Sequence, residues 1–168
     1  MKKIFIAIAL LMSVLAFAQV RDTFGDWTAA ITVDPMDDSV SGYYISYNQE
    51  AKYESLGMVI GITVAGTNIT DFAIASVKNK FASTLPVPKT EKTFKVTYRF
   101  DKNTPVTLNW ITSDDGSTLS IPDAERQALL DQLIGADVMV IRVTLKSGYI
   151  DFVFNVGGFL DVLANIGG

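Results

Sequence analysis

Carboxylate side chains are the groups with which this chain could carry out acid–base or metal chemistry. The 168 residues include 18 Asp and Glu but no His and no Cys. Without imidazole or thiolate there is no Ser/His/Asp triad, no Cys/His dyad and no zinc or copper site built from those ligands. Paired carboxylates could still act in a glycosidase, and clustered oxygens could bind Ca²⁺.

An acidic segment early in the chain offers the densest set of such oxygens. It consists of Asp34, Pro35, Met36, Asp37 and Asp38. The segment lacks the regular ligand spacing and the closing Glu of an EF-hand loop, whereas Pro and Asp are typical turn residues. A turn is therefore favoured over a calcium site, and we predict no metal or other cofactor.

The remaining carboxylates do not form a recognisable catalytic pattern. Asp114 and Asp115 precede Gly116, and Asp-Gly is a preferred pair in hairpin turns. A glycosidase would need two carboxylates about 5 to 10 Å apart in a cleft, and the other acidic residues are scattered along the chain. We predict no catalytic residue and expect that the chain is not an enzyme.

Aromatic residues are the other candidate binding groups. Exposed Tyr and Trp are favoured at protein interfaces and sugar sites, but aromatic residues in strands mostly pack in the core. We therefore predict that Trp27 and Trp110 lie in the core, and keep Trp27 together with the 34–38 segment as a candidate interaction motif. Four tyrosines lie near Trp27 in the sequence: Tyr43, Tyr44, Tyr47 and Tyr53.

The first eighteen residues have the three parts of a bacterial secretion signal. Lys2 and Lys3 are basic, the run from Ile4 to Phe17 is almost wholly apolar, and Ala16 and Ala18 are the small residues that a signal peptidase reads. We predict a signal peptide over 1–18, with cleavage before Gln19.

The alternative for this segment is a membrane anchor. Its apolar stretch of about fourteen residues is shorter than the roughly twenty needed to cross a bilayer as a helix. The chain has no Cys that could be acylated at the cleavage site. We therefore expect a periplasmic or secreted protein with no membrane anchor after cleavage.

The charge of the remaining chain excludes one class of partner. The sequence has 14 basic residues, and without Lys2 and Lys3 it has 12 against 18 acidic ones, a net charge of −6. Nucleic-acid binding depends on neutralising phosphates with Lys and Arg. We therefore expect no nucleic-acid partner.

Alternation of apolar and polar residues is the dominant pattern after the leader, and it predicts strands. The clearest case is Phe94 to Phe100, in which Lys95, Thr97 and Arg99 form the polar side of a sheet that is wet on one face. The predicted strands are 27–33, 40–47, 57–65, 69–77, 94–100, 106–112, 137–145 and 149–156.

Two short helices complete the predicted elements. A helix near 122–134 begins with Pro122 and Asp123, has leucines at helical spacing and ends before Gly135. A second apolar helical pattern runs from Phe159 to Ile166. About eight short strands with few helices predict a mainly β fold, one antiparallel sandwich or barrel-like domain over 19–168, most simply a β-sandwich.

Several motifs together resemble a family of small periplasmic and prophage-encoded bacterial proteins of largely unknown function. The family includes an accessory protein associated with type VI secretion, and its members open with a Trp strand followed by an acidic Pro-containing turn. The motifs that carry the resemblance are Gly25-Asp26-Trp27, Asp34 to Ser39, Thr107 to Trp110, Leu133 to Asp137, Val140 to Thr144 and Phe152 to Gly158. The resemblance covers most of the chain after the leader and implies an extracytoplasmic β-sandwich.

These observations lead to two functional hypotheses. The first is an exported, non-enzymatic binding or accessory protein of the bacterial envelope with a protein partner there. The second is a carbohydrate-binding domain or a carboxylate-dependent hydrolase that acts on envelope glycans. A flat exposed face or an unpaired edge strand would favour the first, and an aromatic strip or a cleft with facing carboxylates would favour the second.

Overall fold

The computed structural model describes residues 20–33, 40–51, 58–65, 68–76, 92–114 and 116–166. Over these ranges the chain is mainly β, and the strands pair with their neighbours antiparallel. The predicted fold class is confirmed. The strands are β1 Val20–Phe24, β2 Trp27–Val33, β3 Val40–Ala51, β4 Met58–Ala65, β5 Asn68–Ser76, β6 Thr93–Phe100, β7 Val106–Thr112, β8 Thr118–Ser120, β9 Val138–Leu145 and β10 Gly148–Asn155.

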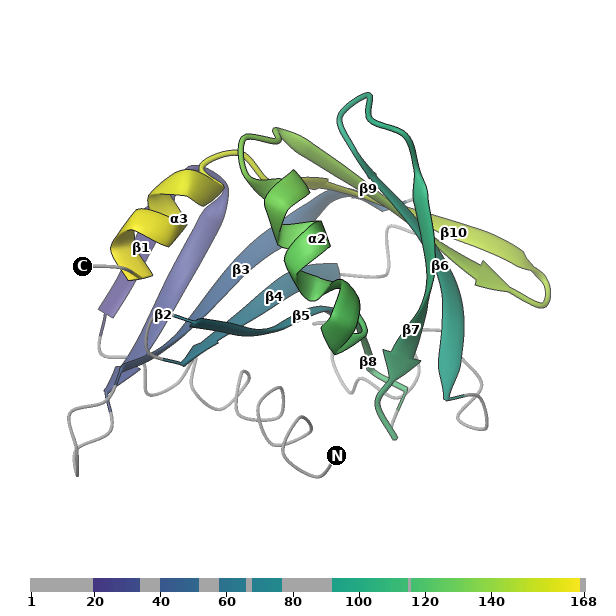
Figure 1. Ribbon diagram of the computed structural model, residues 1–168, viewed down its shortest axis with the longest axis horizontal. Helices are drawn as coiled ribbons and strands as arrows, with labels where there is room; N and C mark the ends of the chain where they lie inside the picture. Colours follow the sequence, from purple (N-terminus) through teal and green to yellow (C-terminus); the bar gives the residue numbers. More distant parts are fainter. Residues whose placement is uncertain are drawn as a thin grey trace.

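All ten strands belong to one sheet, which curls until it meets itself (Figure 1). The strand order is β1-β2-β3-β10-β9-β6-β7-β8-β5-β4, and β3 also pairs with β4. The strands from β3 through β10 to β4 therefore form a closed ring, with the β1–β2 hairpin attached to β3. Because two curved parts of the same sheet face each other, the packing resembles that of a sandwich.

Strand β3 makes this arrangement possible because it is twelve residues long. Residues 40–46 of β3 pair with β2, and residues between Asn48 and Ala51 pair with β10. Both β2 and β10 thus have the same long strand as a neighbour. The predicted strand ended at Tyr47, because the polar residues that follow have low strand propensity; pairing with β10 extends it.

Two strands were not predicted from the sequence. The β1 strand has three polar residues in a row between Val20 and Phe24, so it shows no alternation, and β8 has only three residues, too few to show one. Each is defined by its partners: β1 pairs with β2, and β8 lies between β5 and β7. The predicted turn between β7 and β8 is present, since Gly116 has a φ of +73° and donates to the Ser113 carbonyl at 3.0 Å.

The core lies inside the curled sheet and is built from alternate residues of each strand. In β6 the side chains of Phe94, Val96, Tyr98 and Phe100 are buried, whereas Lys95 and Arg99 are exposed. The predicted polar side of this strand is therefore confirmed. Burial of such large side chains contributes about 1.5–3 kcal/mol each, which holds the strand firmly in register.

Helices α2 (Asp123–Leu133) and α3 (Phe159–Ile166) cover two different parts of the sheet (Figure 1). The α2 helix follows Pro122, has two acidic residues in its first turn and buries Leu129, Leu130 and Leu133 against the core. The α3 helix lies beside β1 and β2 and buries Phe159 and Val162. None of the described helices is long and apolar enough to cross a membrane.

Candidate functional site

The candidate interaction motif is only partly within the described residues. Asp34, Pro35, Met36, Asp37 and Asp38 lie outside them. Trp27, at the start of β2, is fully buried, as is Trp110 in β7. Their predicted place in the core is confirmed. Trp27 can therefore affect the surface only indirectly, by fixing the positions of the residues around it.

Trp27 joins the N-terminal hairpin to the C-terminal end of the sheet. Its indole Nε1 donates a buried hydrogen bond to the Val156 carbonyl at 3.0 Å, across 129 residues of sequence. Its ring also packs on Phe159 at the start of α3, with 5.3 Å between the ring centroids. A buried donor and acceptor that pair with each other avoid the cost of leaving either unsatisfied.

Two glycines allow the backbones to meet at this junction. Gly25, in the turn between β1 and β2, has a φ of +59°, and a Cβ placed there would lie 2.7 Å from the Gly157 oxygen. Gly158 has a φ of +87°, and its Cβ would lie 2.9 Å from the Phe24 oxygen. Only residues without a side chain fit this contact. We call the contact between residues 24–27 and 156–159 the terminal junction.

The outer surface of β7, β6, β9 and β10 is a continuous and mainly polar face. These four strands are neighbours in the sheet, in that order. We call their outward surface the four-strand face. Its outward residues are Thr93, Lys95, Thr97 and Arg99 of β6, Thr107, Asn109 and Ile111 of β7, Val138, Val140, Arg142 and Thr144 of β9, and Tyr149, Asp151, Val153 and Asn155 of β10.

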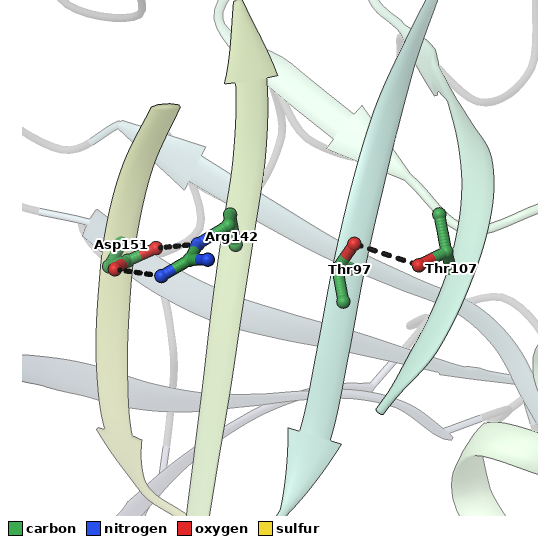
Figure 2. Close-up of polar contacts among 4 residues, drawn as sticks. All are labelled: Thr97, Thr107, Arg142 and Asp151. Atoms are coloured by element: carbon green, nitrogen blue, oxygen red, sulfur yellow. Dashed lines mark hydrogen bonds and ion pairs between the residues drawn. The ribbon is translucent and has the colours of Figure 1, made fainter. Parts of the chain in front are cut away.

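Arg142 lies at the centre of the four-strand face and is held from two sides. Its Nε and Nη2 donate to the two carboxylate oxygens of Asp151 at 2.7 and 2.8 Å (Figure 2). Its guanidinium carbon lies 4.0 Å from the centroid of the Tyr149 ring. The hydrogen bond with Asp151 raises the pKa of Arg142 above its usual value. The pairing fixes the direction of the guanidinium, because a two-point contact leaves it little rotational freedom.

The row that contains Arg142 continues across the sheet. Thr97 of β6 is directly paired in register with Arg142 and shares a hydrogen bond of 2.8 Å with Thr107 of β7 (Figure 2). The four residues of Figure 2 therefore form one line across four strands, perpendicular to their direction. Cross-strand pairs of this kind hold side chains in fixed positions on a sheet surface.

The four-strand face is basic although the chain as a whole is acidic. Its charged residues are Lys95, Arg99, Arg142 and Asp151, a formal charge of +2. Lys95 and Arg99 are exposed, and neither has an ion-pair partner among the described residues. Two cations are thus available to a partner, next to a third whose direction is fixed.

A second group of polar residues lies between α2 and the inner side of the sheet. Tyr98 is buried near Glu125 of α2, and desolvation first, then the Glu125 charge, raise the pKa of its hydroxyl. The Trp110 ring packs near Tyr98 and Phe72. Its Nε1 is buried without a hydrogen-bond acceptor in the part of the chain that is described. Among the described residues this indole therefore contributes packing only.

Asp71 of β5 is a partly buried carboxylate that interacts with charged residues of α2. Burial is the largest influence and raises the pKa of Asp71 above 3.8, although a backbone hydrogen bond and Arg126 of α2 act in the opposite direction. Arg126 also pairs with Asp123, one turn earlier in α2. The Arg126 charge is therefore shared between two carboxylates and does not fully offset the effect of burial on the pKa of Asp71.

Asp71→Asn should raise the melting temperature at neutral pH. A carboxyl group whose pKa is higher in the folded chain binds its proton more tightly there, so stability falls as pH rises through the interval above 3.8. The substitution removes this loss at about pH 7 and gives little or no gain at about pH 3. Thermal unfolding followed by circular dichroism at both pH values measures the difference; an equal gain at both would contradict the desolvation explanation.

No set of described residues has the arrangement of a metal site. Groups of three or more acidic side chains that could hold an ion are not found among them. The turn between β7 and β8 is stabilised by Ser113. Its Oγ accepts hydrogen bonds from the Ser117 and Thr118 amides at 3.1 and 3.0 Å. Turn formation was also the interpretation drawn from the sequence.

Sequence reasoning found the polar side of one of the four strands and missed the centre of the face. It placed Lys95, Thr97 and Arg99 on a polar side, which the structure confirms. It did not identify Arg142 or Asp151. The short turn at 146–147 could have revealed this pair, because a two-residue connection sets Leu145 opposite Gly148 and hence Arg142 opposite Asp151.

Comparisons with known proteins add no relative. No family model matches the chain, and neither a curated protein nor a solved structure matches it.

Proposed function

We propose that this chain is an exported, non-enzymatic binding protein of the bacterial envelope that contacts a protein partner through the four-strand face. The observation that carries the proposal is the arrangement at the centre of that face. Arg142 is fixed by Asp151 and Tyr149 while it stays about half exposed. Arg and Tyr are among the residues that contribute most to protein interfaces.

The shape of the surface also supports a protein partner. The four-strand face is the outer side of a continuous sheet, and it displays Ile111 and Tyr149 among polar residues. Broad surfaces with a few exposed apolar side chains and a polar surround are typical of non-obligate protein interfaces. Export is part of the proposal because residues 1–18 have the composition of a cleavable leader.

A carbohydrate ligand is the second candidate, and one observation favours it. Tyr149 is an exposed aromatic residue with Thr144 beside it in register, and sugars bind to aromatic rings flanked by hydrogen-bonding groups. However, the Arg142 guanidinium already stacks on the Tyr149 ring at 4.0 Å. A sugar would have to compete with this cation or use the other side of the ring, so we favour the protein partner.

The binding role is tested by capture from the envelope fraction of the cells that export the chain. Arg142→Glu should lower the amount of captured partner about fivefold or more, because it reverses the charge at the centre of the face. The control is Asn165→Glu, which adds a negative charge on the exposed side of α3 and should leave capture unchanged. Equal capture by both variants, or retention on a glycan array without any captured protein, would contradict the proposal.

A further inference from the structure

The cations of the four-strand face lie at three successive levels along the strand direction. Lys95 and Arg99 are four residues apart in β6, and Thr97 lies between them. Arg142 of β9 is paired in register with Thr97, so it lies halfway between the two β6 cations. A rise of about 3.4 Å per residue separates successive levels by about 7 Å, and neighbouring strands are about 4.8 Å apart.

This spacing equals the repeat of side chains along one side of an extended peptide. Alternate residues of a strand point to the same side, and their repeat is also about 7 Å. We infer that the four-strand face binds an extended segment of a partner protein that carries acidic side chains at alternate positions. The inference rests on the proposed function and names the chemistry of the partner.

The hydrogen-bonding capacity of Arg142 is sufficient for this role. Asp151 accepts from Nε and Nη2, and the remaining nitrogen of the guanidinium is not used in this pair (Figure 2). A guanidinium has five N–H donors, so a two-point contact leaves others for a second carboxylate. Asp151 therefore orients Arg142 without using all of its donors.

The charge of the rest of the protein favours a short segment over an extended polyanion. After the predicted cleavage the chain has 12 basic and 18 acidic residues. The surface outside the four-strand face is therefore acidic and repels nucleic acid, anionic glycan chains and anionic membranes. Such repulsion acts over about 10 Å at moderate salt. A short acidic segment on the four-strand face approaches the local cations and avoids most of the acidic surface.

The test uses two synthetic seven-residue peptides of equal charge with the exported chain. One has three glutamates alternating with threonines, and the other has three adjacent glutamates among the same threonines. The alternating peptide should bind about fivefold more tightly, because its three carboxylates can meet the three cations together. Titration of the ¹⁵N-labelled chain by NMR measures both affinities and shows which amides respond.

Matched charge reversals locate the contact. Arg99→Glu, on the face, should weaken binding of the alternating peptide about threefold or more. Lys102→Glu makes the same change in the turn beyond β6 and should alter it less than twofold. Equal affinity for the two peptides, equal effects of the two substitutions, or tighter binding to phosphatidylglycerol vesicles would overturn the inference.

The same experiments separate this inference from the proposed function. If Arg142→Glu abolishes capture of an envelope protein but the peptides bind equally, the alternating acidic chemistry is wrong and the binding role stands. If neither the capture experiment nor the peptide titration depends on the four-strand face, both proposals are wrong.

Discussion

Gly25→Ala is expected to lower the free energy of unfolding by about 3 kcal/mol. Two costs add at this position. The residue has a φ of +59°, which L side chains rarely adopt, and its new Cβ would lie 2.7 Å from the Gly157 oxygen. Because the obstacle is backbone, it cannot move aside as the end of a flexible side chain would. Urea unfolding followed by tryptophan fluorescence measures the change.

Gly135→Ala is the matched control for this prediction. Gly135 follows α2 with a φ of +78°, and a Cβ placed there would meet nothing within 4 Å. It therefore has the conformational cost alone, about 1 kcal/mol. If Gly25→Ala is no more destabilising than Gly135→Ala, the close approach at the terminal junction does not limit residue size.

Trp27→Phe is expected to destabilise the protein by about 3 kcal/mol. The substitution leaves a small cavity beside Phe159 and removes the buried donor to the Val156 carbonyl. A buried acceptor without a partner costs about 1–3 kcal/mol, in addition to the lost packing. Equilibrium unfolding followed by circular dichroism measures the total.

Trp110→Phe provides the comparison, because Trp110 is equally buried but its Nε1 has no acceptor among the described residues. Removing this indole leaves no carbonyl unpaired, so the expected loss is only about 1.5 kcal/mol, from packing. Equal losses for the two substitutions would show that the hydrogen bond to Val156 contributes nothing measurable.

The residues predicted to stabilise the fold most and the face proposed to bind a partner lie in different parts of this molecule. The two largest predicted losses fall at the terminal junction, where the N-terminal hairpin meets the start of α3. The charged residues of the four-strand face lie on other strands and are exposed or half-exposed. Substitutions on that face can therefore test binding without unfolding the chain.

Local patterns explain why most strands and both helices could be predicted from the sequence. In β6 every apolar residue from Phe94 to Phe100 is buried, because alternation leaves only one side for the core. The β7 strand was predicted with the bounds that it has. The β1 and β8 strands could not be found in this way, since their few residues become strands only through their neighbours.

The closure of the sheet and the centre of the candidate site depend on contacts that no local pattern contains. Closure requires β3 to pair with β10, a segment about 100 residues further along the chain. The same is true of Thr97 and Arg142, which are neighbours only because β6 lies beside β9. Sequence alone placed Thr97 on the polar side of its strand, but it could not bring Thr97 and Arg142 into one row.

Site-specific photo-crosslinking in the cells that produce the chain naturally tests most directly whether the four-strand face contacts a protein. A benzoyl-phenylalanine at Asn109, on the exposed side of β7, should give a discrete crosslinked band with one envelope protein. The same probe at Ala164, on the exposed side of α3, should give none. A band from Ala164 and none from Asn109, or no band from either, would contradict the account.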